Sequence, residues 1–150
     1  MCMISIEDLK QFASGRNILL VEDNEINAGI ARAQLEPAGF NVAWVDDGSK
    51  ACEMFMNSSP HYYSAIVTDL MMPVMDGIEA AKVIRNSDRA DSNIPILGIT
   101  ANAFSNKDSL SSESVINSVI SKPYKREELL DWIYSSVMEY EKTDVTGYKG

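Results

Sequence analysis

Short apolar runs alternate along the chain with stretches in which apolar residues recur every three or four positions. The runs lie at residues 18–21, 41–45, 64–68, 95–99 and, more weakly, 119–121. Near-continuous apolar runs of this length are typical of strands covered on both faces, and the intervening spacing is that of amphipathic helices. Strands that alternate with helices predict an α/β fold, a doubly wound parallel sheet of five strands with helices on both faces.

The same pattern predicts where the domain begins and ends. Residues 17–140 hold the five expected strands and the helices that follow them, so we expect one domain there. Residues 1–16 form an N-terminal extension, with a short helix expected around Ile6 to Ala13. Residues 141–150 are polar and contain glycine, and we expect a flexible C-terminal tail.

Composition restricts the functions to consider. The chain has 150 residues, 45% of them hydrophobic, which suits one compact domain. A formal net charge of −9 argues against direct binding to nucleic acid, which needs a cationic face. The two cysteines, Cys2 and Cys52, fit no metal-binding spacing, and His61 lies in a polar stretch typical of an exposed loop. Without an apolar run near ~18 residues or a secretory signal pattern, we expect a cytoplasmic protein with no membrane segment.

Polar side chains follow four of the five expected strands. They are, in chain order, Glu22, Asp23, Asp69, Thr100 and Lys122, and Pro123 follows the last of them. In an open parallel sheet, ligands bind outside the carboxyl ends of the strands, where the strand order switches. These residues are therefore expected to meet at one edge of the sheet.

The chemistry of these side chains favours a cation and a phosphoryl group. Crowded carboxylates raise one another's pKa unless a cation neutralises them, and oxygen ligands without Cys or His select Mg²⁺ or Mn²⁺. Lys122 adds a positive charge of the kind that holds phosphate, and Thr100 adds a hydroxyl donor. Asp69 lies centrally and is the best nucleophile for phosphorus, while Glu22 and Asp23 are better placed to hold the metal.

Each of these residues also has a plainer interpretation. Glu22, Asp23 and Asn24 would suit the start of the first helix, since Asp and Asn are good N-caps and acids favour its positive end. Thr100 would serve as another N-cap, and Lys122 as a solvated surface lysine. Only the coincidence of all of them at strand ends favours a functional site.

Four motifs in this order carry a family resemblance: ILLVEDNEIN at 18–27, DLMMPVMDG at 69–77, ILGITANAF at 96–104 and SKP at 121–123. With them the chain resembles the receiver domains of response regulators over residues 17–140, and most of all the receivers of hybrid histidine kinases. The resemblance implies a flavodoxin-like, CheY-like (βα)5 fold with strand order 2-1-3-4-5. It also implies a phosphoacceptor of two-component signalling, rather than an enzyme that turns over outside substrates.

The resemblance further implies a role for each site residue. Asp69 would accept a phosphoryl group from the phosphohistidine of a sensor histidine kinase or a histidine phosphotransfer protein. Mg²⁺ would be bound by Asp23, Asp69 and the backbone carbonyl of Met71, with Glu22 reaching it through water. Thr100 and Lys122 would contact the phosphoryl group, and the peptide bond before Pro123 is commonly cis in the family.

The chain departs from the family at Val119, where many members carry a Tyr or Phe that swings inward when the loop after the Thr closes. The phosphorylation chemistry is retained, because none of its groups is lost. The usual relay lacks its aromatic ring at this position, and the sequence leaves open how the switch works without it. Phe104, close to Thr100 in the sequence, either takes over part of that role or packs as a residue of the fourth helix.

Two other functions stay open at this point. Segment 109–119, which has Val115 where hybrid-type members tend to carry Gly as well as the change at Val119, would suit a module that no longer takes phosphate and acts as a fixed docking surface. A phosphatase with an aspartate nucleophile is disfavoured, because Met71 occupies the place of its general acid and cannot transfer a proton. A weak homodimer through the last helix, with Trp132 or Tyr140 as anchors, is also open.

Overall fold

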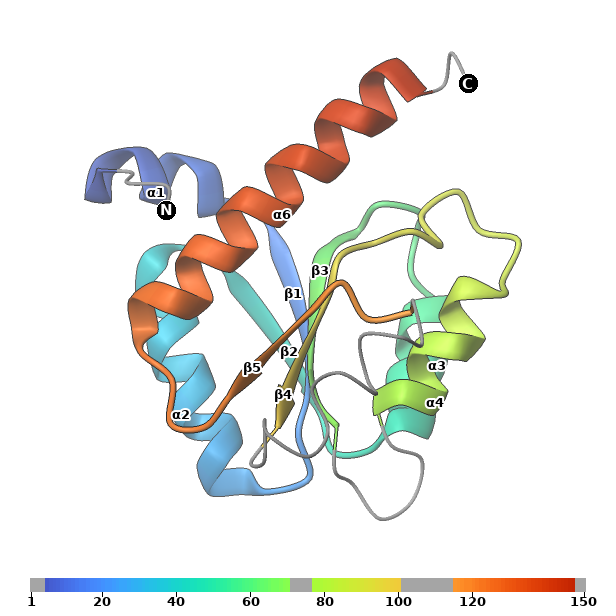
Figure 1. The fold of residues 1–150 in the computed structure, drawn as a ribbon, viewed down its shortest axis with the longest axis horizontal. Helices are drawn as coiled ribbons and strands as arrows, with labels where there is room; N and C mark the ends of the chain where they lie inside the picture. The colour runs from blue at the N-terminus through green and yellow to red at the C-terminus, as the bar shows by residue number, and fades with distance from the viewer. Residues whose placement is uncertain (1–4, 71–76, 101–114, 148–150) are drawn as a thin grey trace.

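The computed structural model describes residues 5–70, 77–100 and 115–147 (Figure 1). In chain order its elements are α1 (Ile6–Ala13), β1 (Asn17–Val21), α2 (Glu25–Leu35), the 3₁₀ helix η1 (Glu36–Ala38), β2 (Asn41–Val45), α3 (Gly48–Met56), β3 (Tyr63–Asp69), α4 (Gly77–Arg85), β4 (Ile96–Thr100), β5 (Ser118–Ser121) and α6 (Arg126–Gly147). No helix in these ranges is both long and apolar enough to cross a membrane.

The five strands form one parallel sheet in the order β2-β1-β3-β4-β5. The chain moves outward from β1 to β2, and then crosses back to β3 on the other side of β1. The strand order therefore switches direction between β1 and β3, which is where an open α/β sheet binds its ligands. Both the predicted α/β class and the order 2-1-3-4-5 are confirmed.

Helices cover both faces of the sheet, with α2 and α6 on one face and α3 and α4 on the other (Figure 1). Successive residues of a strand point to opposite faces. In β1, Leu20 accordingly packs into the core beneath α2 and α6, whereas Leu19 packs into the core beneath α3 and α4. Both side chains are buried, as expected for a strand that is apolar throughout.

Helix α1 is part of the packed domain, and the helix expected at Ile6 to Ala13 is confirmed. Its N-cap, Ser5, accepts a hydrogen bond from the amide of Asp8 at 3.0 Å. Ala13 is fully buried in the core beneath α2 and α6. The Phe12 ring meets the Tyr134 ring of α6 edge to face, with 4.9 Å between centroids.

Helix α6 continues to Gly147, so the boundary expected at residue 140 falls inside a helix rather than at the start of a flexible tail. Glu141 forms a bidentate ion pair with the guanidinium of Arg16. The polar composition of this segment did not predict a helix. The ion pair that holds it is made with Arg16, near the other end of the chain.

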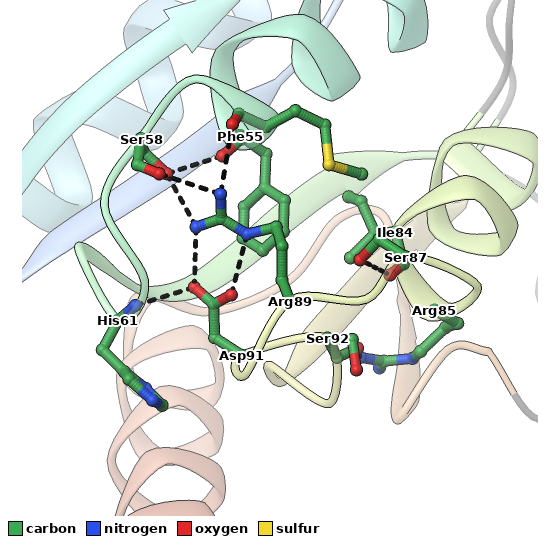
Figure 2. Close-up of polar contacts among 10 residues, drawn as sticks. Phe55, Ser58, His61, Ile84, Arg85, Ser87, Arg89, Asp91 and Ser92 are labelled. Atoms are coloured by element: carbon green, nitrogen blue, oxygen red, sulfur yellow. Dashed lines mark hydrogen bonds and ion pairs between the residues drawn. The ribbon is translucent and has the colours of Figure 1, made fainter.

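The edge where the strands begin, called here the amino-end edge, is held by arginines (Figure 2). Arg89 donates from Nε and Nη2 to the buried carboxylate of Asp91, at 2.9 and 3.2 Å. Its Nη1 donates to the carbonyls of Met56 and Ser58, and its guanidinium stacks 4.5 Å over the Phe55 ring. Arg89 thus joins the loop before β3 to the loop before β4.

Arg85 makes a similar clamp between the starts of β4 and β5. Its guanidinium donates to the carbonyls of Ser92, Ile94 and Val115, at 2.7 to 3.1 Å. It also donates at 2.8 Å to Oδ1 of Asn117, the same atom that accepts from the amide of Ile96 at 2.7 Å. Strands β4 and β5 therefore begin from fixed positions relative to each other.

Candidate functional site

Three predicted carboxylates meet at the opposite edge, where the strands end. Asp69 is the last residue of β3, and Glu22 and Asp23 follow β1 directly. Val21 pairs with Thr68 in the ladder between these neighbouring strands, so Glu22 and Asp69 are brought level with each other. Oxygens from all three carboxylates lie within 4.8 Å of one another, close enough to share one metal ion.

The three acids differ in exposure, and this difference sets their electrostatics. Glu22 and Asp69 are buried, with 5% and 8% of their surface exposed, while Asp23 is exposed. Burial and, next, the negative charge of Asp69 raise the pKa of Glu22 from 4.5 to about 7. A bound cation would remove this penalty, and an all-oxygen ligand set suits a hard divalent ion such as Mg²⁺.

Lys122 supplies the positive charge of the site. Its Nζ lies 3.9 Å from Oε1 of Glu22 and 3.8 Å from Oδ2 of Asp69. These separations are long for hydrogen bonds but short enough for strong attraction in a partly buried setting. Lys122 follows β5 directly, and the peptide bond that joins it to Pro123 is cis.

Thr100 is brought to the same edge as the last residue of β4, and it is fully buried. Its carbonyl accepts a hydrogen bond from the amide of Lys122 at 2.9 Å, which ties the end of β5 to the end of β4. On the neighbouring strand Asp69 pairs with Ile99 in the ladder. Thr100 therefore lies one position beyond Asp69 along the sheet.

Close packing beside Asp69 depends on a glycine in β4. A Cβ atom built at Gly98 would lie 2.7 Å from Cδ1 of Leu70, far inside a normal contact. The absence of a side chain at Gly98 leaves room for Leu70, which is buried with 1% of its surface exposed. The residue that follows Asp69 is thereby anchored over the sheet.

A pocket of about 190 Å³ opens beside the carboxylates, between α2 and the segment that follows β5. Glu22, Asp69 and Lys122 contribute its charged lining, and residues such as Ala31 and Tyr124 contribute apolar surface. On α2, Ile26 and Ile30 are large apolar side chains with 75% and 51% of their surface exposed, and Ile30 also lines the pocket. The charged site thus borders an exposed apolar surface.

The capping interpretation of the first acidic segment is settled by Asn24. Its side-chain Oδ1 accepts a hydrogen bond from the amide of Asn27 at 2.9 Å, so Asn24 is the N-cap of α2. Glu22 instead accepts from the amide of Asn24 at 3.2 Å through Oε2. Glu22 and Asp23 are therefore available for the site rather than used as the helix cap.

The predictions for four other residues have different outcomes. Met71 and Phe104 lie outside the described residues. Val119 is buried, with 7% of its surface exposed, in the core beneath α3 and α4, where it pairs with Gly98 across the ladder. His61 is exposed in the loop before β3, as predicted, and its amide donates at 2.8 Å to Asp91.

Sequence reasoning gave Trp44 no place in the site. The indole Nε1 of this β2 residue donates a hydrogen bond of 2.7 Å to the backbone carbonyl of Glu22. The strand pattern carried no signal for this contact, because it exists only when β2 lies beside β1 in the observed register.

Residues 18–134 match the family described as the response regulator receiver domain. The chain belongs to this family. It is 33% identical over 129 residues to the peroxide stress-activated histidine kinase mak1 of Schizosaccharomyces pombe, covering 85% of this chain and 8% of the kinase. It is 37% identical over 120 residues to the autoinducer 2 sensor kinase/phosphatase LuxQ of Vibrio vulnificus, covering 80% of this chain and 13% of LuxQ.

The fold agrees with solved receiver domains. The receiver domain of the sensor histidine kinase PA1611 from Pseudomonas aeruginosa, solved with a magnesium ion in its active-site cleft, superposes with a TM-score of 0.74 at 33% identity. The match covers 83% of this chain and 98% of that domain. The chain is thus a CheY-like receiver domain of two-component signalling, and its homologues include hybrid histidine kinases of which it spans only a small part.

Proposed function

We propose that this receiver domain takes a phosphoryl group onto Asp69 from a phosphohistidine, in a Mg²⁺-dependent reaction, and thereby switches a partner-binding face. The donor would be a sensor histidine kinase or a histidine phosphotransfer protein. One observation carries the proposal: the oxygens of Glu22, Asp23 and Asp69 lie within 4.8 Å of one another, and Nζ of Lys122 lies 3.8 Å from Asp69. This combines a cation site, a nucleophile and a phosphate-binding ammonium group.

The residues present fit a magnesium ion. Glu22, Asp23 and Asp69 would hold it, with the backbone carbonyl of Met71 proposed from the family resemblance. Their hard oxygens suit a divalent cation, whose charge would offset the repulsion between Glu22 and Asp69. When bound, the ion neutralises the carboxylates and the charge on phosphoryl oxygens. The magnesium ion in the cleft of the PA1611 receiver supports this assignment.

Asp69 is the best placed of the three acids to attack phosphorus. It is buried on a central strand, next to the lysine and between the acid pair and Thr100. A carboxylate oxygen of Asp69 forms the new O–P bond while the P–N bond of the phosphohistidine breaks. The electron pair of the P–N bond stays on the imidazole nitrogen. Lys122 then pairs with a phosphoryl oxygen, and the Thr100 hydroxyl donates to another.

A protein donor is supported by the surface around the pocket. Exposed Ile26 and Ile30 border the charged site, and exposed apolar side chains beside a reactive group are typical of a place where another protein binds. The pocket also leaves a route by which a side chain of the donor can approach Asp69.

Phosphorylation by a small donor tests the proposal directly. The chain is incubated with acetyl phosphate and Mg²⁺, and intact-mass spectrometry measures the added phosphoryl group. We expect labelling of the wild-type chain, loss of labelling in Asp69→Asn, and no change in Asp88→Asn, a control at an exposed acid. Equal labelling of Asp69→Asn would overturn the proposal. A wild-type chain that is neither labelled nor binds Mg²⁺ would favour a fixed docking module instead.

A further inference from the structure

The parallel ladder between β1 and β2 stops beside the acids, and the hydrogen bonding at that point is unusual. The last ladder pair is Val21 with Val45, and the amide of Glu22 still donates to the carbonyl of Val45 at 3.0 Å. In a regular parallel ladder, the carbonyl of Glu22 would next accept from the amide of Asp47. Asp47 is instead the N-cap of α3, where its side chain accepts from the amide of Lys50 at 2.7 Å. Strand β2 therefore ends before it can supply the next ladder donor.

The Trp44 side chain supplies the donor at this point. Its indole Nε1–H donates to the carbonyl of Glu22 at 2.7 Å, which is at the short end of the range for such bonds. The ring packs against the core beneath α2 and α6, to which its ladder partner Leu20 also belongs. Because packing fixes the ring, the indole donor is held in one place.

We propose that Trp44 is a positioning residue for the acidic segment: its indole N–H fixes the carbonyl of Glu22 and so sets where Glu22 and Asp23 present their carboxylates. The role of that segment in holding Mg²⁺ rests on the proposed function. The hydrogen bond itself is a property of this chain's own residues, and its effect on the segment is measurable in the metal-free protein.

The main chain of Glu22 is held on both sides by consecutive residues of β2, through its amide to Val45 and through its carbonyl to Trp44. The carboxylates of Glu22 and Asp23 repel each other. If one of these hydrogen bonds is lost, the segment is therefore expected to sample more conformations. Groups that hydrogen-bond to metal-binding residues and orient them increase the affinity for the ion. Without such groups, the ligands must be ordered when the ion binds. Loss of one such neutral hydrogen bond is expected to weaken Mg²⁺ binding about 3- to 10-fold.

The test compares Trp44→Phe, which keeps an aromatic ring but removes the N–H, with Trp132→Phe as a matched control. Trp132 lies on α6 and packs against the same core. Isothermal titration with MgCl₂ is expected to show about 3- to 10-fold weaker binding for Trp44→Phe and unchanged binding for Trp132→Phe. Nε1–H of Trp44 is expected to be protected from exchange in the wild-type protein and to shift its NMR resonance when Mg²⁺ is added.

A second measurement uses the full chain in EDTA and does not depend on the metal. Amide hydrogen exchange at residues 22–24 is expected to be faster in Trp44→Phe than in the wild type, while exchange in β3 is unchanged. Equal exchange at 22–24 in the two proteins overturns the proposal, whether or not the wild-type chain binds Mg²⁺. Faster exchange throughout the sheet also overturns it, because the ring would then act only in packing. A wild-type chain that binds no Mg²⁺ counts against the proposed function, and the exchange result still decides the role of Trp44.

Discussion

At the edge where the strands end, buried Glu22 faces the like charge of Asp69; at the edge where they begin, buried Asp91 faces the guanidinium of Arg89. Both edges bury a carboxylate almost completely, with 5% of Glu22 and 1% of Asp91 exposed. Burial and Asp69 raise the pKa of Glu22 to about 7. Burial would also raise the pKa of Asp91, but hydrogen bonds from Arg89 and from the amide of His61 hold it below its ordinary value.

The difference shows how one fold separates stability from function. At the amino-end edge, charges and carbonyls are paired with arginine, so the structure there is stabilised without help from a ligand. At the opposite edge, where the strands end, burial and the charge of Asp69 raise the pKa of Glu22, and a bound cation would offset the repulsion between the carboxylates. The two edges should therefore respond in opposite ways to substitution.

The largest effect is expected from Arg89→Met, which leaves Asp91 buried without its positively charged partner. Removing one member of a buried ion pair typically costs about 3–5 kcal/mol of unfolding free energy. Urea denaturation followed by circular dichroism measures this loss. The exposed Arg126→Met variant is the control and should change little. A loss under about 1 kcal/mol for Arg89→Met would contradict the assignment of this edge as the stabilising one.

The next effect is the pH dependence of stability in EDTA. The pKa of Glu22 is raised in the folded state. Its contribution to the unfolding free energy is therefore fully present below pH 4.5 and is lost as pH rises through about 7. The pKa of Asp91 is lowered in the folded state. Its contribution to the unfolding free energy is therefore present above pH 3.8 and is lost as pH falls further.

We therefore expect the metal-free protein to be most stable near pH 4–5 and to lose about 1–3 kcal/mol of unfolding free energy by pH 8. Urea denaturation at a series of pH values measures the profile. The Glu22→Gln variant should flatten the loss above pH 4.5. An unchanged slope in that variant would show that another group is responsible.

A smaller effect, of the opposite sign to that of Arg89→Met, is expected from Asp69→Asn in EDTA. Removing one negative charge beside Glu22 should raise the unfolding free energy by about 1 kcal/mol, although the attraction to Lys122 is lost as well. The same variant should lower the pKa of Glu22, which NMR of the labelled carboxyl carbon can follow. Destabilisation of the metal-free protein by this change would refute the idea that the site edge is strained by its charges.

The smallest effect is expected from Glu141→Gln, which weakens the ion pair with Arg16. The Glu141 and Arg16 side chains are 44% and 23% exposed, so solvent screens the pair and under about 1 kcal/mol should be lost. Hydrogen exchange should become faster in α1 and stay unchanged in β3. Glu139→Gln, at an exposed neighbouring position, is the control. Unchanged exchange in α1 would mean that apolar packing holds this helix without the ion pair.

Much of the site was predictable because it depends on short-range pattern and on one geometric rule. Apolar runs located the strands, and the rule that parallel strands end at one edge placed Glu22, Asp69 and Lys122 together. The order of the strands came from the family resemblance, since no spacing along the chain determines it. The continuation of α6 beyond residue 140 was not predicted, because the polar residues near Glu141 gave no local sign of the contact with Arg16.

By itself, the sequence determined the alternation of strands and helices and the residues that follow each strand, because periodicity is a property of neighbouring positions. Only the tertiary structure decided which distant groups became partners: Trp44 with the carbonyl of Glu22, Arg89 with the carbonyl of Ser58, and Arg16 with Glu141. These contacts depend on strand register and helix packing, which bring side chains and carbonyls within 3 Å across many residues of chain. The acids Glu22 and Asp23 could be identified from the sequence. Trp44, the residue proposed to position them, could be identified only from the pairing of β2 with β1.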